Sequence, residues 1–201
     1  STYAVSFNGN GSTGGSVPAN QTKTHGIDVS VSSNSGSLVK TGYTFGGWNT
    51  AAGGSGTSYA EGALYGVDAA VTLYAKWSAN SLTVTYNSQG GTAVSDGSTT
   101  SGGVIASAPV APTRTGYVFT GWFAESTGGS AISFPYTHSQ TADFTLYAQW
   151  SVNTYVVSFD GNGSTGGSVP GSQTKTHGDD LTLASNSGSL VKTGYTFGGW
   201  N

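Results

Sequence analysis

The chain has 201 residues, of which 33 are glycine, 12% are aromatic and only 7% are charged, and its formal net charge is −3. Disordered chains are poor in aromatic residues and usually highly charged, so this composition predicts a folded protein. Six basic residues against nine acidic ones exclude the basic surface that nucleic-acid binding requires. No apolar run approaches the roughly 18 residues of a transmembrane helix, which argues against membrane insertion.

Cysteine and methionine are both absent. The chain therefore has no disulfide and no thiolate metal site. Without an initiator methionine, it is expected to be a processed product or part of a longer protein. Sparse charge and a polar surface of Ser, Thr, Asn and Gly suit an extracellular bacterial protein, so we expect a location outside the cell or on the bacterial surface.

The first elements along the chain are predicted to be strands followed by glycine-rich turns. In Tyr3–Phe7, apolar and polar side chains alternate, which is the period of a half-buried strand. The turn Asn8–Gly11 follows, and its Asn-Gly pairs tolerate the positive φ that a tight hairpin needs. A further strand is expected at Asp28–Ser32. The same elements recur later, with strands at Leu82–Tyr86, Tyr155–Phe159 and Asp180–Ala184 and turns at Asn87–Gly91 and Asp160–Gly163.

The next predicted strand begins at Tyr43 and contains two glycines before Trp48. Tyr43 and Phe45 share one face of this strand, whereas Trp48 has the opposite parity. Either the indole lies on the other face, or Gly46 and Gly47 hold a β-bulge that turns it back to the inner face.

Helix signals are weak. The best candidate is Ser58–Tyr65, which is short and interrupted by Gly62, and single turns could begin at Asp68 or at Thr141–Asp143. The strand Val71–Trp77 then alternates between two faces. We predict a mainly β fold with little helix, α+β at most.

Internal repeats organise the sequence. The phrase Thr-Gly-Tyr-x-Phe-x-Gly-Trp begins at Thr41, Thr115 and Thr193, and Leu-Tyr-Ala-x-Trp begins at Leu73 and Leu146. The predicted domains are two complete repeats and a third that lacks its closing strand: residues 1–78, 79–151 and 152–201.

The first and third repeats are nearly identical. Thr2–Asn49 and Thr154–Asn201 differ at nine of 48 aligned positions, whereas the second repeat shares only the recurring phrases. Such an order typically arises by duplication of a two-repeat block. We expect the third repeat to be completed by residues outside this chain, either downstream in a longer array or as a strand from a neighbouring chain.

These phrases resemble the Listeria–Bacteroides repeat family, which includes the internalin B-type B repeat. The family pattern is matched by the opening segment Tyr155–Gly163, the proline-containing joint Pro109–Gly116, the phrase Gly116–Trp122 and the closing Leu146–Trp150. The resemblance covers nearly the whole chain. It implies small β-grasp-like units in tandem on bacterial surface or secreted proteins, and it supplies no catalytic residues.

No catalytic, cofactor-binding or metal-ligating residue is assigned from the sequence. The histidines are His25, His138 and His177, and the first and last are one repeat position. No Gly-x-Ser-x-Gly elbow lies between a strand and a helix, so the chain is not expected to be an enzyme.

Two further patterns have structural explanations. Asp160, Asn162 and Ser164 alternate as calcium ligands do, but no closing glutamate follows, and a turn stabilised by its own side chains is the favoured interpretation. The cations Lys40, Lys192 and Arg114 share one repeat position. Crosslinking through a lysine amine is not expected there, because an arginine replaces it in one repeat, and a solvated cation lying against an aromatic ring is predicted instead.

The recurring aromatic residues are expected to fill the core of each repeat, because a small unit needs large side chains. Trp48, Trp77, Trp122 and Trp150 are predicted to be largely buried. Better candidates for a surface patch are the rings that do not recur: Tyr59, Tyr65, Phe123, Phe134 and Tyr136.

The sequence therefore predicts a non-enzymatic structural repeat protein, a stalk, spacer or filament segment of a bacterial surface protein. Its expected partners are neighbouring repeats of a longer array or further copies in a head-to-tail filament. The alternative is an adhesin that binds a glycan or a host protein through exposed aromatic rings.

Overall fold

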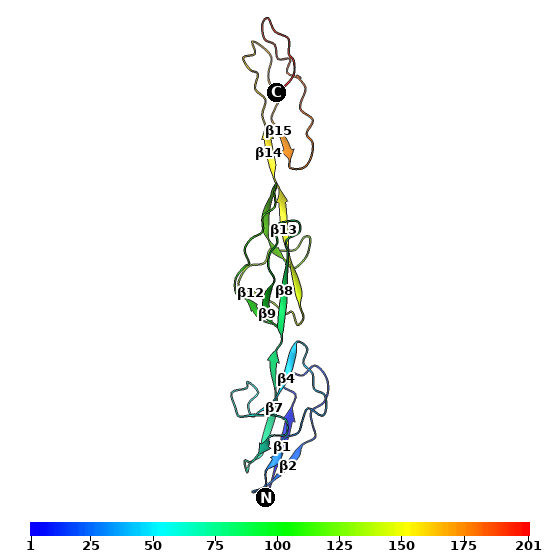
Figure 1. Cartoon of the computed structure of the whole chain (residues 1–201), viewed down its shortest axis with the longest axis vertical. Helices are drawn as coiled ribbons and strands as arrows, with labels where there is room; N and C mark the ends of the chain where they lie inside the picture. The colour runs from blue at the N-terminus through cyan, green and yellow to red at the C-terminus, as the bar shows by residue number, and fades with distance from the viewer. The chain divides into compact units, whose positions relative to one another are not determined.

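The structure, a computed structural model, describes residues 1–201 and contains strands, turns and loops but no helix (Figure 1). The expectation of a mainly β fold is confirmed. The strands are β1 (Thr2–Asn8), β2 (Gln21–Thr24), β3 (Val29–Ser30), β4 (Tyr43–Asn49), β5 (Ser58–Tyr59), β6 (Leu64–Tyr65), β7 (Val71–Ala79), β8 (Ser81–Asn87), β9 (Gly97–Thr100), β10 (Val104–Ile105), β11 (Tyr117–Phe123), β12 (Tyr136–Thr137), β13 (Phe144–Val152), β14 (Thr154–Val157) and β15 (Gln173–Thr176).

The chain divides into two compact units. One contains Ser1–Thr85, Asp96–Ala108 and Ser133–Thr145, and the other contains Tyr86–Ser95, Pro109–Ile132 and Leu146–Asn201. The division passes through the second repeat of the sequence, so the repeat boundaries stay a prediction from the sequence pattern.

In the first unit, β7 lies at the centre of a five-stranded sheet with the order β2-β1-β7-β4-β5. It runs parallel to β1, with Val5 opposite Val71, and antiparallel to β4, with Tyr43 opposite Ala79. Strand β7 holds this position because Leu73 and Ala75 are both fully buried and alternate with more exposed residues. The same unit contains the antiparallel pairs β8–β9 and β10–β12.

In the second unit, β11 pairs antiparallel with β13, as β4 does with β7, and β14 pairs antiparallel with β15. The register of both recurring strands shifts before the tryptophan, between Phe45 and Trp48 in β4 and between Phe119 and Gly121 in β11. Of the two alternatives left by the sequence, the β-bulge is therefore correct. It turns Trp48 into the core, where none of its side chain is exposed.

Three local predictions are wrong. The helix candidate Ser58–Tyr65 instead forms the short strands β5 and β6, because each finds a partner strand, β4 for β5 and β3 for β6. The turn Asn8–Gly11 does not close a tight hairpin, since the partner of β1 begins only at Gln21. The segment Asp180–Ala184 forms no strand, because no described segment pairs with it as β6 pairs with β3.

The turn still has the backbone expected of it. Asn10 has φ 49° and Gly11 has φ 79°, and the intervening loop folds back to residues 36–40, where Thr13 N donates to Val39 O at 2.7 Å. A β-grasp unit packs its sheet against a helix. Since the chain has no helix, the β-grasp description remains an expectation from the family resemblance.

Candidate functional site

The recurring aromatic residues form the same ring arrangement in the first and second repeats. Phe45 contacts Trp48 and Trp77 edge-on, with ring centroids 5.2 and 5.5 Å apart. In the second repeat, Phe119 makes the equivalent contacts with Trp122 and Trp150, each at 5.6 Å. The rings therefore fill cores, as predicted. Trp48 and Trp122 are buried at 0% and 2% exposed, whereas Trp77 and Trp150 are only partly buried.

The predicted surface patch of non-recurring rings is wrong in two of its five members. Tyr65 is 3% exposed, because its ring packs on Tyr59 and its hydroxyl donates to Ala69 O at 3.0 Å. Phe123 is 9% exposed at the end of β11. Phe134 and Tyr136 are partly exposed, with ring centroids 6.4 Å apart.

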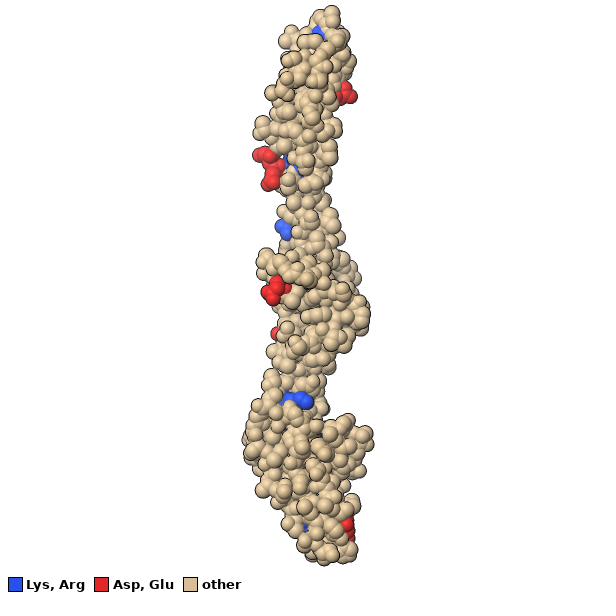
Figure 2. Space-filling model, turned by 180° about the vertical axis from the view of Figure 1, so that it is seen from behind, with Lys and Arg blue, Asp and Glu red and all other residues tan.

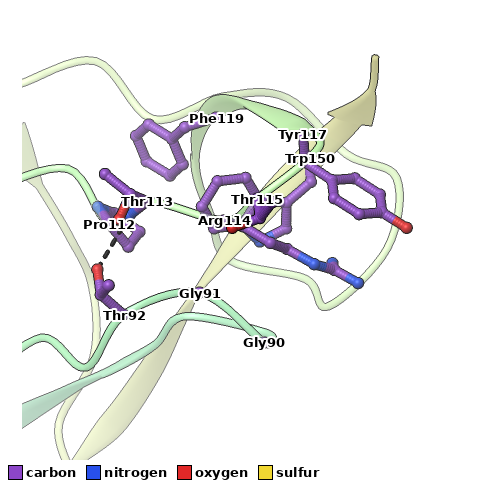
Figure 3. Close-up of a pocket in the computed structure, with 10 residues that line it drawn as sticks. All are labelled: Gly90, Gly91, Thr92, Pro112, Thr113, Arg114, Thr115, Tyr117, Phe119 and Trp150. Atoms are coloured by element: carbon purple, nitrogen blue, oxygen red, sulfur yellow. Dashed lines mark hydrogen bonds between the residues drawn. The ribbon is translucent and has the colours of Figure 1, made fainter. Parts of the chain in front are cut away.

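The shared cation position joins the opening turn to the recurring tyrosine. Figure 3 shows Arg114 extending alongside Tyr117, with Gly90 and Gly91 of the turn nearby. The guanidinium carbon lies 3.9 Å from the centre of the Tyr117 ring, and an Arg114 N–H donates to Gln89 O at 3.1 Å.

The other two repeats have the same contact, with Lys40 4.6 Å from the Tyr43 ring centre and Lys192 5.1 Å from that of Tyr195. The predicted cation on an aromatic ring is confirmed in all three repeats. Beside Arg114, an open hollow of about 640 Å³ is lined by Thr92, Thr113, Tyr117 and Trp150 (Figure 3).

The alternating side-chain oxygens accept hydrogen bonds from the backbone of their own turns. Asp160 Oδ1 accepts a hydrogen bond from Asn162 N at 2.7 Å, and Asn8 Oδ1 accepts one from Asn10 N at 2.8 Å. This arrangement is a local side-chain turn, as the favoured interpretation expected. No group of three or more His, Asp and Glu residues in the structure could hold a metal ion.

A buried lysine is the feature that the sequence analysis missed. Lys23 is 0% exposed, and its ammonium donates to Asp68 Oδ1 at 2.7 Å and to Thr24 O at 2.9 Å. Asp68 also accepts from Gly26 N at 3.0 Å and contacts His25 Nδ1 at 2.9 Å. The hydrogen bond from Lys23, supported by the one from Gly26 N, lowers the pKa of the Asp68 carboxyl. The one available signal was the recurrence of Lys-Thr-His in the third repeat.

The second repeat also contains a buried histidine. His138 is 6% exposed, its Nε2 lies 3.1 Å from Thr99 Oγ1, and its Nδ1 accepts from Gln140 N at 3.2 Å. An accepting Nδ1 requires the neutral ring. Burial also lowers the pKa of His138, which favours the same neutral form.

The linkers between repeats are held by the same pair of backbone hydrogen bonds. In the first linker, Asn80 N donates to Gly42 O at 2.9 Å, and Asn80 O accepts from Ser101 N at 2.8 Å. In the second, Asn153 N donates to Gly116 O at 2.8 Å, and Asn153 O accepts from His177 N at 2.9 Å. One asparagine thus connects the glycine of one recurring phrase with the hairpin of the next repeat. We call these contacts the first and second joints.

The second joint includes an aromatic contact. The His177 ring lies 5.9 Å from the Tyr117 ring and 6.4 Å from the Tyr155 ring. Gly116 is so close that a Cβ atom there would lie 1.9 Å from the imidazole. A Cβ atom at this position would therefore displace the His177 ring, and the φ of 79° independently favours glycine.

Charged side chains contribute little to the surface. The few Lys, Arg, Asp and Glu residues appear as isolated patches among uncharged atoms in Figure 2. The features that recur are cores, turns, cation–tyrosine contacts and joints, and together they define a tandem-repeat β protein.

Comparison with known proteins agrees with this description. The model of the Listeria-Bacteroides repeat domain matches three stretches that cover most of the chain, residues 3–76, 83–149 and 155–201. The chain belongs to the Listeria–Bacteroides repeat family, as the recurring phrases indicated.

Three relatives carry similar sequence. A protein of Evansella cellulosilytica named "Putative Gly-rich membrane protein" is 35% identical over 98% of this chain and 22% of its own length. A second protein of that organism, named "Putative membrane protein", is 37% identical over 64% of this chain and 19% of its own length. Internalin H of Listeria monocytogenes is 37% identical over 46% of this chain and 15% of its own length. The chain thus spans less than a quarter of each relative. In the structure itself, nothing helical is long and apolar enough to cross a membrane.

Proposed function

We propose that the chain is a non-enzymatic structural segment, a stalk, spacer or filament segment, of a bacterial surface protein that acts outside the cell. The observation that carries this proposal is the joint, in which the same two hydrogen bonds are made by Asn80 and by Asn153 although the flanking sequences differ. A repeated connection suits a protein whose property depends on the number of repeats it links.

The contacts of the large side chains, which lie within their own repeats, support the same proposal. The recurring rings pack within cores, and the recurring cations contact the turns and tyrosines of their own repeats. The partners that this arrangement fits are neighbouring repeats, including a head-to-tail array. Two relatives are named as membrane proteins and one as an internalin, which is compatible with a surface location.

Chains of increasing repeat number test the proposal. Spin labels in the first and last repeats are expected to report a distance that grows by one constant increment for each added two-repeat block. Antibodies against the chain are expected to label intact cells of the source organism. A distance between the spin labels that does not change with repeat number would overturn the spacer role. Antibody labelling that appears only after cell lysis would also overturn it.

An adhesin is the second candidate, and the hollow beside Arg114 favours it. Tyr117 and Trp150 are both partly exposed there, and aromatic faces beside a cation suit a sugar ring with an acidic group. A glycan array supports this function if a hit is lost in Arg114→Gln and retained in Lys40→Gln. An array without hits removes it.

A further inference from the structure

The chain passes from one repeat to the next through a single residue. Strand β7 ends at Ala79 and β8 begins at Ser81, with Asn80 between them, and β13 ends at Val152 just before β14 begins at Thr154. A closing strand therefore continues almost directly into the next opening strand. Tension along an array would leave a repeat through the end of its closing strand and enter the next repeat through the beginning of its opening strand.

In the first repeat, the opening strand β1 and the closing strand β7 lie side by side and run parallel (Figure 1). Val5 lies opposite Val71, and Asn8 lies opposite Tyr74. Because the strands are parallel, the beginning of β1 and the end of β7 lie at opposite ends of the pair. A force on those two points slides one strand lengthwise along the other. The evenly spaced hydrogen bonds of the pair are then loaded together, whereas a force that peels the strands apart loads them one after another.

Two side-chain hydrogen bonds extend this paired region beyond β1. Trp77 Nε1 donates to Gly9 O at 3.0 Å, and Asn10 Nδ2 donates to Ala75 O at 2.9 Å. Gly9 and Asn10 directly follow β1, and their partners lie on β7 beyond the paired positions. Both bonds therefore resist the same lengthwise sliding. We call the β1–β7 pairs and these two bonds the shear zone of the repeat.

The second repeat makes the same two side-chain bonds although its turn differs in sequence. Trp150 Nε1 donates to Ser88 O at 2.9 Å, and Gln89 Nε2 donates to Ala148 O at 2.6 Å. The amide donor is an asparagine in one repeat and a glutamine in the other. The recurring feature is thus the bond between the turn and the closing strand, whichever residues form the turn.

The shear zone is enclosed by the core on one side. Val5, Leu73 and Ala75 are 0% exposed, and Phe7 is 7% exposed. Water therefore competes for these hydrogen bonds from one face only, and enclosed hydrogen bonds are electrostatically stronger than exposed ones. Strand β7 is also paired with β4 along its other edge, which holds it in place while β1 is pulled.

We propose that the shear zone is a mechanical clamp, which gives the chain a load-bearing function: it resists tension applied along the array. The inference rests on the proposed stalk or spacer, because a segment between two attachment points carries tension. The strands β2, β5, β3 and β6 do not join the opening strand to the closing strand. They stabilise the fold outside the loaded path.

Single-molecule pulling on the 201-residue chain tests the clamp. The chain contains no cysteine, so handles can be attached at chosen exposed positions. One variant carries Ser1→Cys and Ser81→Cys, and a force between these residues slides β1 along β7. The other carries Ser1→Cys and Ala70→Cys. Because Ala70 directly precedes β7, a force between these residues peels the same two strands apart.

The two pulling geometries are expected to give different unfolding rates for the same folded repeat. Unfolding of the first repeat is recognised by the chain it releases, about 3.5 Å per residue between the handles. At a fixed force, sliding is expected to unfold the repeat at least about tenfold more slowly than peeling, because more than one hydrogen bond then resists at once. Equal rates in the two geometries would overturn the clamp.

Two tryptophan substitutions separate the clamp from general stability. Trp77→Phe removes the N–H that bonds to Gly9 O, whereas Trp48→Phe removes one that donates to Ser32 O at 2.9 Å, outside the shear zone. Trp77→Phe is expected to speed unfolding by sliding up to about tenfold, the factor for one hydrogen bond, and to affect peeling much less. Trp48→Phe is expected to speed both by a similar factor. A Trp77→Phe effect that is equal in the two geometries would overturn the clamp.

The clamp and the spacer role fail in distinguishable ways. A spin-label distance that grows with repeat number, together with equal unfolding rates in the two geometries, retains the spacer and overturns the clamp. A slower unfolding by sliding, together with a constant label distance, supports the clamp within a repeat and overturns the spacer.

Discussion

Trp48 and Trp122 occupy equivalent positions but differ in what the indole N–H contacts. Trp48 Nε1 donates to Ser32 O at 2.9 Å, whereas Trp122 Nε1 is buried without a partner in the protein. Replacement of either by phenylalanine removes the same volume, but Trp48→Phe also leaves a carbonyl unpaired, at a cost of about 1–3 kcal/mol. We expect Trp48→Phe to destabilise its repeat more than Trp122→Phe does. Hydrogen exchange of core amides measures both, and equal losses would contradict this reading of the contacts.

The buried Lys23 predicts an asymmetry between two substitutions that break one ion pair. Asp68→Asn leaves the enclosed ammonium without its counter-charge, whereas Lys23→Met removes the charge and fills the space. The remaining Asp68 carboxylate is 31% exposed and still accepts from Gly26 N. Asp68→Asn is therefore expected to lower the denaturation midpoint more than Lys23→Met, and the opposite order would show that Lys23 contributes little through its charge.

His138 predicts a pH dependence of stability. Burial lowers its pKa in the folded state, so the unfolded chain binds the extra proton first as the pH falls. The contribution of the neutral ring is complete above the unfolded value of about 6.5 and is lost as the pH falls toward the lowered folded pKa. His138→Phe keeps an aromatic ring beside Phe144. This variant is expected to reduce the pH dependence of the denaturation midpoint in that window. A pH dependence of stability that is unchanged in His138→Phe would contradict this assignment.

Within strand β4, the two adjacent glycines of the bulge have different requirements. Gly47 has φ 95°, and a Cβ there would lie 2.6 Å from Tyr59 O, whereas a Cβ on Gly46 would meet nothing closer than 3.7 Å. Gly47→Ala is expected to cost about 1–3 kcal/mol from the backbone alone, and more from the contact with Tyr59. Gly46→Ala is expected to be nearly neutral. Thermal denaturation of the pair checks this, and similar losses would mean that the bulge does not depend on Gly47.

Strands that bury one face were predictable from the sequence, and strands that depend on a distant partner were not. The alternation in Val71–Trp77 indicates β7 because its buried residues occur at every second position. The short strands β5 and β6 carry no such period, and they exist because β4 and β3 lie beside them. Recurrence identified the aromatic cores and the cation on tyrosine. It could not identify the Lys23–Asp68 pair, because the partner lies 45 residues away and belongs to no phrase.

At the scale of the whole chain, the repeats are linked through the glycine of the recurring phrase, and three glycines provide a controlled test. Gly42, Gly116 and Gly194 all have φ 79°, so alanine meets the same backbone strain at each. The surroundings differ. A Cβ would lie 1.9 Å from the His177 ring at Gly116 and 2.1 Å from Ser101 Oγ at Gly42, but nothing lies within 4 Å at Gly194.

Gly116→Ala is therefore expected to displace the His177 ring from Tyr117, with loss of the nuclear Overhauser contacts between the two rings and faster exchange of the His177 amide. Gly194→Ala carries the same strain and is expected to leave that joint unchanged. Adding His177→Ala to Gly116→Ala removes the contact and should restore part of the lost stability, so the two substitutions should not be additive. Additive effects, or equal perturbation of the joint by Gly194→Ala, would mean that the second joint is held by the backbone hydrogen bonds of Asn153 alone.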